Sequence, residues 1–275
     1  MADTYTGFAV LIAVFVAAIF VRAIKIIMSS SWYKKSFAQS HRIWIDVTKR
    51  VFDPVKRKLF DDLAKHLKIL NSDVVEIGIG PGANFDYYPH GASLIAVDPN
   101  PHMEELLKSN LEKVGDSVHL KKFVAASAED MSCTGQVGVE DNSVAAVVCT
   151  KLLCCLTEDQ IKKTLQEVKR VLMPGGRFYF LEHVAGHPWT VKYLLQHFVS
   201  KSLLWPSLYD GCHCDRKTLP YIEQGGFKMV QSKKVWANCS PSMYSECKDT
   251  FSVWHTKILL YFVDFILVGF AEKEQ

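Results

Sequence analysis

Short apolar runs recur along the chain and alternate with segments in which apolar residues stand three or four positions apart. The runs have the length and composition of strands, and the segments between them have the periodicity of helices. Near-continuous apolar character is typical of parallel strands buried on both faces. The pattern therefore predicts an α/β fold with a doubly wound sheet. The expected strands are residues 74–77, 93–98, 120–126, 144–149, 177–181, 227–236 and 261–271.

Helices are expected between these strands. A glycine-rich loop after residue 77 should lead into one helix, and Pro101 can occupy the first turn of another that runs through Leu111. Thr157 and Gln160 have capping-box spacing at the start of a helix that ends before Pro174. A further helix is expected over residues 188–204.

The chain opens with an uninterrupted apolar run from Gly7 to Val21, followed by Arg22 and Lys25. At about 1.5 Å per residue the run is short for a hydrocarbon core of roughly 30 Å, unless the flanking basic side chains reach the interface. A cleaved signal peptide is disfavoured because no basic residue precedes the run. We expect residues 1–28 to form a retained membrane anchor that either spans the bilayer or lies in its interface. The positive charge that follows the run predicts a cytosolic location for the rest of the chain.

Residues 29–70 combine helical periodicity with basic charge. Residues 22–70 contain twelve Lys and Arg against four Asp and Glu, whereas residues 71–275 contain twenty against twenty-four. This asymmetry favours an anionic membrane surface as a partner and disfavours nucleic acid, although an ordinary solvated helix face is the alternative. Pro54 predicts a break near Asp53, with one helix before it and a second from about Val55 to Leu70.

A candidate nucleotide site lies between residues 73 and 98. Gly78, Gly80 and Gly82 follow the first strand, and Asp98 ends the second, where an acid can accept hydrogen bonds from ribose hydroxyls. The spacing also fits a dinucleotide site. Glu76 favours S-adenosylmethionine instead, because a carboxylate inside the first strand suits an ammonium group better than a pyrophosphate. No second glycine turn of a dinucleotide fold follows later in the chain.

Roles at this site follow from position in the expected sheet. We assign Glu76 and the backbone of 78–82 to the methionine end of the cofactor, and Asp98 to its ribose. The adenine side is assigned to Asn100 and to residues Ala128 and Glu129 after the third strand. Cys149 and Thr150, at the end of the fourth strand, are assigned to the edge that faces the methyl group.

The eight cysteines do not resemble a disulfide framework, so a reducing compartment is expected. The triplet Cys212-His213-Cys214 could suggest a metal, but a structural zinc site needs four ligands and no second pair stands at a fitting spacing. The sequence therefore predicts no metal site.

Several motifs together resemble the class I S-adenosylmethionine-dependent methyltransferases, and more narrowly the membrane-anchored methyltransferase-like seven family of thiol S-methyltransferases. The motifs are residues 76–85 (EIGIGPGANF), 98–101 (DPNP), 147–150 (VVCT), 171–176 (VLMPGG), 178–184 (FYFLEHV) and 210–212 (DGC). The combination of Cys-Thr after the fourth strand, Glu-His-Val after the fifth and Asp-Gly-Cys at 210–212 is the more specific signal. The chain departs from the family pattern at Pro81 and in a longer segment over residues 238–260.

The resemblance implies a Rossmann-like, seven-stranded sheet whose last strand is antiparallel, within a methyltransferase domain over residues 71–275. It implies methyl transfer from S-adenosylmethionine to small lipophilic thiols, on endoplasmic reticulum or lipid-droplet membranes facing the cytosol. The first motif adds Asn84 to the cofactor-binding candidates. Alternatives are O- or C-methylation of a quinone- or lipid-like acceptor, and a non-catalytic membrane-anchored scaffold. The sequence predicts no oligomeric state.

The catalytic candidates are His183 and Asp210, because both follow elements that end at the carboxyl edge of the sheet, where ligands bind. Either could help a thiol to lose its proton. His183 could equally be a hydrogen-bonded histidine that shapes the pocket, and Asp210 could be a turn or capping acid. The segment Thr150-Lys151-Leu152-Leu153 lacks the Asn/Asp-Pro-Pro-aromatic turn of amine methyltransferases, which disfavours nucleic-acid bases as acceptors.

Overall fold

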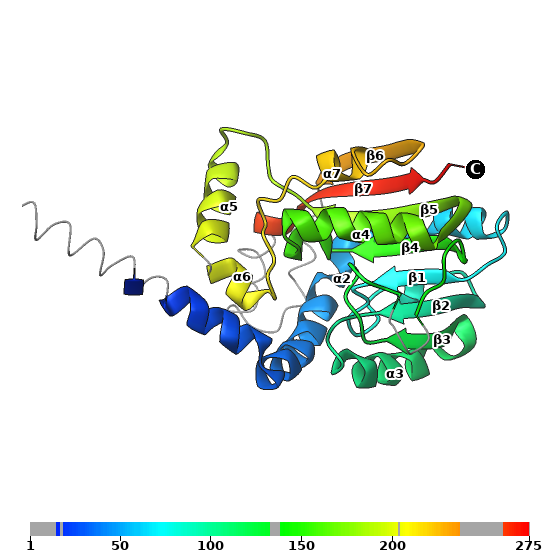
Figure 1. Cartoon of the computed structure of the whole chain (residues 1–275), viewed down its shortest axis with the longest axis horizontal. Helices are drawn as coiled ribbons and strands as arrows, with labels where there is room; N and C mark the ends of the chain where they lie inside the picture. Colours follow the sequence, from blue (N-terminus) through cyan, green and yellow to red (C-terminus); the bar gives the residue numbers. More distant parts are fainter. Residues whose placement is uncertain (1–14, 17–18, 133–137, 203, 237–260, 275) are drawn as a thin grey trace, which may run out of the picture.

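The computed structural model of the chain centres on a seven-stranded sheet (Figure 1). The residues it describes are 15–16, 19–132, 138–202, 204–236 and 261–274. The strand order is β3-β2-β1-β4-β5-β7-β6. The strands are β1 (Val74–Ile77), β2 (Ala92–Val97), β3 (Val118–Val124), β4 (Val144–Thr150), β5 (Leu172–His183), β6 (Met229–Trp236) and β7 (Phe265–Glu272).

Strand directions confirm the predicted doubly wound sheet. Strands β1 to β5 pair in parallel, and β7 is antiparallel to both of its neighbours, β5 and β6. Central strands β1 and β4 are buried along almost their whole length, as their continuous apolar sequences predict. The order reverses between β1 and β4, so a crevice is expected at the carboxyl ends of these two strands.

Helices cover both faces of the sheet. Apolar residues of α2 (Ser31–Leu67) and α3 (Met103–Val114) belong to one core cluster, and those of α4 (Glu158–Val171) and α7 (Leu219–Glu223) belong to the cluster on the other face. Two further helices, α5 (Val191–Lys201) and α6 (Leu204–Leu208), lie beyond the ends of the strands (Figure 1). Thr157 and Gln160 form the predicted capping box at the start of α4.

The predicted break at Pro54 is wrong, because helix α2 continues through this proline to Leu67. Figure 1 shows that the blue helix changes direction along its length instead of stopping. A proline inside a helix removes one hydrogen bond and can bend the helix, and tertiary packing can compensate. Here Val51 and Phe52 before the proline and Leu59 after it all enter the core cluster, which fixes both halves of α2.

The helix predicted after the glycine loop is also absent from the described structure. Only a short 3-10 helix, η1 (Phe85–Tyr87), stands between β1 and β2. The connection is short, and Tyr87 and Tyr88 are buried within it. Helix α2 contacts this connection instead, since the Lys56 ammonium donates to the Ala83 carbonyl at 3.2 Å and the Tyr87 hydroxyl donates to Asp53 at 3.1 Å.

Two other expectations fall partly or wholly outside the described residues. The proposed anchor over residues 1–28 is described only at 15–16 and from 19 onward, where residues 19–29 are helical. No helix within the described ranges combines the length and apolar character needed to cross a bilayer. The longer segment over residues 238–260 lies outside the description.

Candidate active site

A cavity opens at the carboxyl edge of the sheet, at the crevice that the strand order predicts. We call it the edge cavity. The predicted site residues that line it are Gly78, Gly80, Asp98, Asn100, His183 and Asp210. The structure therefore brings residues of the predicted cofactor side and both catalytic candidates to one cavity, although they lie up to 132 positions apart in sequence (210 − 78).

Asp98 closes the glycine loop from the end of β2. One carboxylate oxygen accepts the Gly80 backbone N–H at 2.9 Å, and the other accepts the Asn100 backbone N–H at 2.9 Å. Burial raises the pKa of Asp98 to about 6, and the two backbone donors oppose that rise. The carboxylate is thus ionised at neutral pH and oriented by the loop next to the cavity.

The glycines at 78 and 82 are required by the backbone. Their φ angles are +64° and +85°, in the left-handed region that side chains disfavour. A Cβ on Gly82 would lie 2.4 Å from the ring of Phe85, and one on Gly78 would lie 3.0 Å from Leu152. The loop can hold this shape only with glycine at these positions.

Glu76 belongs to a buried polar network beside the loop. Its two carboxylate oxygens accept the Asn84 side-chain amide at 2.6 Å and the Tyr88 hydroxyl at 2.8 Å. The same Asn84 amide donates to the Thr150 hydroxyl at 2.9 Å. Burial raises the pKa of Glu76 to about 7, against the two hydrogen bonds. The carbonyl oxygen of Asn84 is buried without a hydrogen-bond partner among the described residues, so this network has an open acceptor.

Several assigned cofactor residues do not line the edge cavity: Glu76, Gly82, Asn84, Ala128, Glu129, Cys149 and Thr150. Glu129 accepts hydrogen bonds from Ser127 and Gln160, and Ala128 is buried in the core cluster on the α4 side. Cys149 is buried in β4, where its thiol donates to Glu182 at 3.4 Å. Their assignment to the adenine and the methyl group remains a prediction.

The opposite wall of the cavity contains a histidine–thiol contact. The Nε2 atom of His183, at the end of β5, lies 3.1 Å from the Sγ atom of Cys212, and the Trp205 indole N–H donates to the same sulfur at 3.1 Å. Burial lowers the pKa of His183 below its usual value, although the charge of Glu182 opposes this effect. The imidazole is therefore neutral near pH 7 and able to accept a proton.

The sulfur atoms of Cys154, Cys155 and Cys212 lie together on this side of the edge cavity, which we call the thiol wall. Burial alone would raise the pKa of Cys212, but hydrogen bonds from Cys154, Cys155 and Trp205 lower it well below its usual value. The three Sγ atoms all lie within 4.8 Å of one another, and all five cysteines in the described part of the chain are free thiols. This cluster was not predicted as part of the site from the sequence. The available signal was the position of the cysteines directly after β4 and in the motif at 210–212.

Asp210 approaches the cavity from the loop after α6. Its φ is +47°, and burial raises its pKa to about 6, as does the neighbouring Cys155. Lys151 enters from the loop after β4, and its ammonium lies 3.8 Å from the centre of the Phe52 ring of α2. Burial lowers the pKa of Lys151 to about 7. Sequence reasoning did not single out Lys151.

Glu182 braces the loop between the two walls. Its carboxylate accepts the backbone N–H groups of Leu152 at 2.9 Å, Leu153 at 3.1 Å and Cys154 at 3.2 Å. These donors start the short helix η3 (Leu153–Cys155). The buried carboxylate thus sets the position of the thiols that follow β4.

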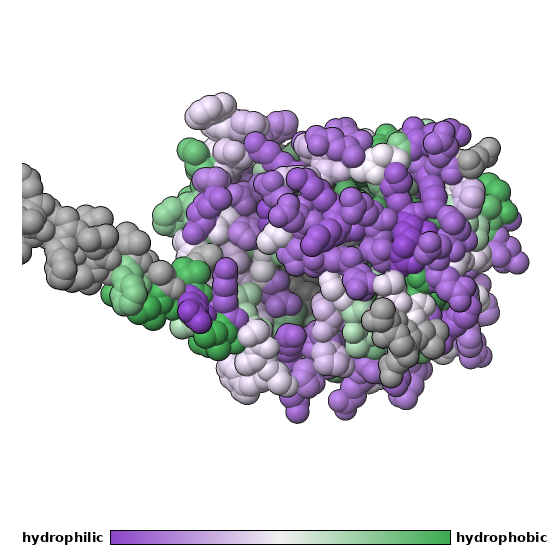
Figure 2. All heavy atoms as spheres, viewed as in Figure 1, coloured by the Kyte–Doolittle hydropathy of each residue, from purple (hydrophilic) through white to green (hydrophobic). Residues whose placement is uncertain are grey.

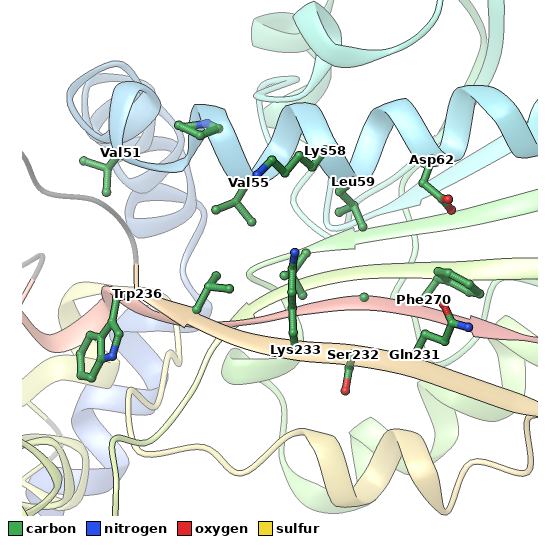
Figure 3. A pocket seen from close by; sticks show the side chains of 14 residues that line it. Val51, Val55, Lys58, Leu59, Asp62, Gln231, Ser232, Lys233, Trp236 and Phe270 are labelled. Carbon is green, nitrogen blue, oxygen red and sulfur yellow. The ribbon is translucent and has the colours of Figure 1, made fainter.

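A second hollow, of about 610 Å³, lies between α2 and strands β6 and β7 (Figure 3). Figure 3 shows Lys233 extending from β6 toward the helix, with Val55 and Leu59 opposite. The hollow is larger than the edge cavity, but none of the predicted site residues lines it. It also lies along the strands and not at their carboxyl ends, so we place the active site at the edge cavity.

Comparisons with known proteins identify the family of the chain. A methyltransferase-domain family model matches residues 75–180, which include the glycine loop, all but the first residue of β1, and strands β2 to β4. The chain is 35% identical to the human thiol S-methyltransferase TMT1A over 197 residues, covering 69% of this chain and 76% of the relative. The chain belongs to the thiol S-methyltransferase family. Rat TMT1B, another member, is 38% identical over 180 residues, covering 64% of this chain and 68% of the relative.

Solved structures support the fold of this thiol S-methyltransferase family member. A S-adenosylmethionine-dependent methyltransferase from Thermotoga maritima, described as a possible histamine N-methyltransferase, superposes with a TM-score of 0.54. The match covers 88% of this chain and all of the bacterial chain, at 15% identity. The class I methyltransferase fold predicted from the motifs is thereby confirmed.

Proposed function

We propose that this protein transfers a methyl group from S-adenosylmethionine to the sulfur of small lipophilic thiols at a membrane surface. The observation that carries the proposal is the edge cavity itself. One wall holds the glycine loop and Asp98, and the other holds a neutral histidine beside a cluster of thiols. Family membership and the names of TMT1A and TMT1B support the same reaction.

The cofactor site fits S-adenosylmethionine. Asp98 is ionised and can accept hydrogen bonds from ribose hydroxyls, and the glycines leave the backbone of the loop free of side chains. The open carbonyl oxygen of Asn84, together with the Glu76 carboxylate, offers acceptors for an ammonium group. A bound cation would lower the pKa of Glu76 from about 7 and hold it ionised.

S-adenosylmethionine supplies a methyl group on a positively charged sulfur, which a thiolate can accept. The residues of the chain prepare the acceptor. Neutral His183 can take the thiol proton, and the buried wall around it excludes water. Trp205 and Cys154 fix the sulfur of Cys212 next to the imidazole and so restrict the orientation of His183.

The lining of the thiol wall favours a soft, apolar acceptor. Polarizable sulfur atoms, the Trp205 ring, Phe37 and Val263 line the cavity there. A small lipophilic thiol matches this lining in both polarity and softness. The phenol and carbon acceptors of the alternative reaction match only its apolar part.

We further propose that residues 1–28 anchor the enzyme to endoplasmic reticulum or lipid-droplet membranes, with the methyltransferase domain over residues 71–275 in the cytosol. The apolar run and the basic excess over residues 22–70 support this arrangement. Residues 29–70 would then join the anchor to the domain, and α2 accounts for most of this segment.

One competition assay tests the reaction. Purified full-length protein receives labelled S-adenosylmethionine and matched alkyl thiols, phenols and quinols in the same vesicles. We expect methylation of the thiols, increasing with chain length because longer chains partition into the lipid. Preferential methylation of phenols would overturn the proposal that thiols are the acceptors. Failure to bind S-adenosylhomocysteine in calorimetry would overturn the proposed methyltransferase activity.

A further inference from the structure

Helix α5 buries polar side chains and exposes apolar ones, which is the reverse of a surface helix in a soluble protein. Its buried positions include the polar residues Lys192, Gln196 and Ser200, spaced four apart. Most of its exposed positions carry apolar side chains instead, with Val191 69% exposed and Phe198 70% exposed. A surface helix in water normally shows the opposite arrangement. Contact with an apolar environment outside the protein would remove these apolar side chains from water.

Hydrogen bonds hold α5 in this orientation. The Gln196 side chain accepts the Gly186 backbone N–H at 2.7 Å and donates to the Phe262 carbonyl at 2.7 Å. Ser200 contacts the Cys214 sulfur at 3.3 Å, and Lys192 pairs with Asp264. Turning the apolar side inward would take these hydrogen bonds away from the Gly186 N–H, the Phe262 carbonyl and Asp264, which is costly for groups that are buried or partly buried. The fold therefore fixes the exposure of the apolar side.

The exposed apolar residues of α5 continue onto its neighbours. We define the apolar face as Trp189, Val191, Leu194, Leu195, Phe198 and Leu208, each at least 41% exposed. Figure 1 places α5, α6 and the helix of residues 19–29 on the same side of the molecule, and Figure 2 shows apolar groups gathered there. A hydrogen bond from Tyr33 to the Ser207 carbonyl, at 3.1 Å, joins the start of α2 to α6.

The charge around the apolar face matches an anionic lipid surface. No acidic residue occurs between Glu182 and Asp210, and none occurs between Asp3 and Asp46. The second of these stretches contains five Lys and Arg. Trp32 and Trp189 are 72% and 91% exposed, and tryptophan is enriched where proteins meet the membrane interface. Exposed apolar side chains, basic neighbours and tryptophans are together the signature of an interfacial membrane helix.

The apolar face adjoins the mouth of the active site. Helix α6 carries Leu208 on this face and Trp205 in the lining of the edge cavity. Tyr209 and Asp210, which follow directly, also line the cavity, and Phe37 enters it from α2. A surface that docks on lipid here would direct the cavity toward the bilayer.

We propose that α5 and α6 form a second membrane contact, separate from the N-terminal anchor, that seats the apolar face in an anionic bilayer. This contact rests on the proposed membrane-surface function and extends it. It lets a lipophilic thiol pass from the bilayer to the edge cavity without crossing water. The anchor holds the enzyme on the membrane, and the apolar face sets its orientation.

Photo-crosslinking tests the contact. Full-length protein is bound to phosphatidylcholine–phosphatidylserine vesicles that contain lipids with photoactivatable acyl chains, and the labelled peptides are mapped by mass spectrometry. We expect labels in both residues 15–29 and α5. The double substitution Leu194→Gln with Phe198→Gln should reduce labelling of α5 by roughly tenfold and leave the N-terminal labels unchanged. Ile69→Gln, at a 79% exposed apolar residue outside the apolar face, is the matched control and should change neither.

The outcomes separate this contact from the anchor. Labels in residues 15–29 without labels in α5 would overturn the second contact and keep the anchor, whereas absence of both would overturn membrane association itself. An apolar face covered by a second copy of the chain would give α5–α5 crosslinks and would also overturn the proposal. Activity provides a further check, because the double variant should lose methylation of vesicle-borne thiols and keep that of a water-soluble thiol.

Discussion

At the scale of single residues, the edge cavity contains an acid for cofactor binding, Asp98, and a candidate base for the acceptor, His183. The environment of each residue sets its protonation state. Asp98 receives two backbone donors, so it stays ionised at neutral pH although it is buried. Burial lowers the pKa of His183, so its imidazole stays neutral. The ionised state of Asp98 and the neutral state of His183 at pH 7 follow from burial and hydrogen bonding together. Each residue gives a measurable pH dependence.

Cofactor binding should weaken as the pH falls through about 6. The pKa of Asp98 is raised to about 6, so the carboxylate that accepts hydrogen bonds predominates above this pH and takes up a proton below it. Calorimetry with S-adenosylhomocysteine at pH 7.5 and 5.5 should show the loss of affinity. Asp98→Ala should abolish binding in a folded protein, whereas Asp116→Asn on the surface should not. Unchanged affinity of the Asp98 variant would place the ribose elsewhere.

Substitution of His183 should make thiol methylation depend on free thiolate. His183→Ala removes the proton acceptor, and we expect the rate near pH 7 to fall roughly a hundredfold. The loss should shrink at higher pH, as thiols with a pKa of about 8.5 ionise in solution. Rates measured from pH 6.5 to 9.5, with cofactor affinity as the control, check this. A deficit that is equal at every pH would show that His183 only shapes the pocket.

At the scale of elements, β5 and η3 depend on each other through Glu182. The carboxylate of the strand accepts three successive backbone N–H groups at the start of η3. This arrangement places Cys154 and Cys155 in the cavity wall. Helix α2 holds another part of the site. The Asn100 side chain donates to the Lys34 carbonyl at 3.0 Å, which links the loop after β2 to the helix.

Replacing Glu182 should destabilise the fold and disturb the thiol wall together. Glu182→Gln presents an amide N–H to buried backbone donors, and the loss should be about 1–3 kcal/mol in the free energy of unfolding. Denaturant unfolding of this variant, compared with the exposed Glu112→Gln, measures the effect. Full stability of Glu182→Gln would mean that water or another group replaces the carboxylate at the start of η3.

At the scale of the whole molecule, every buried apolar residue that the structure describes lies after Ser30. Core contacts of α2 begin with Ala38 and continue through Leu63. Ser30 caps the helix through its side chain, which accepts the Tyr33 backbone N–H at 3.2 Å. Among the described residues, the buried core thus lies after the helix cap.

A chain that begins at Ser29 should fold and bind cofactor normally. The cap at Ser30 is retained, so we expect the melting temperature to stay within about 2 °C of that of the full chain. Binding to anionic vesicles should fall by roughly tenfold or more, because the apolar run is removed. Calorimetry, thermal unfolding and vesicle flotation measure the three quantities. A chain that fails to fold would assign residues 1–28 to the domain.

Much of the fold and of the cofactor side was predictable from sequence. Buried parallel strands have continuous apolar sequences, and a left-handed loop requires glycine, so both leave local signals. The path of α2 through Pro54 and the missing helix after the glycine loop were mispredicted. Local preference favoured a break and a helix, respectively, but contacts of α2 with the core and with the loop decided otherwise.

The sequence by itself determined the sheet, the glycine loop and the acid that closes it, because each is specified by neighbouring residues. Only the tertiary structure assembled the thiol wall, since Cys154 and Cys212 come from loops after different elements. It also decided which side of α5 faces outward. The periodicity of α5 in the sequence is compatible with either orientation of the helix. The hydrogen bonds of Gln196 to the backbone of Gly186 and Phe262 select the orientation that exposes the apolar side.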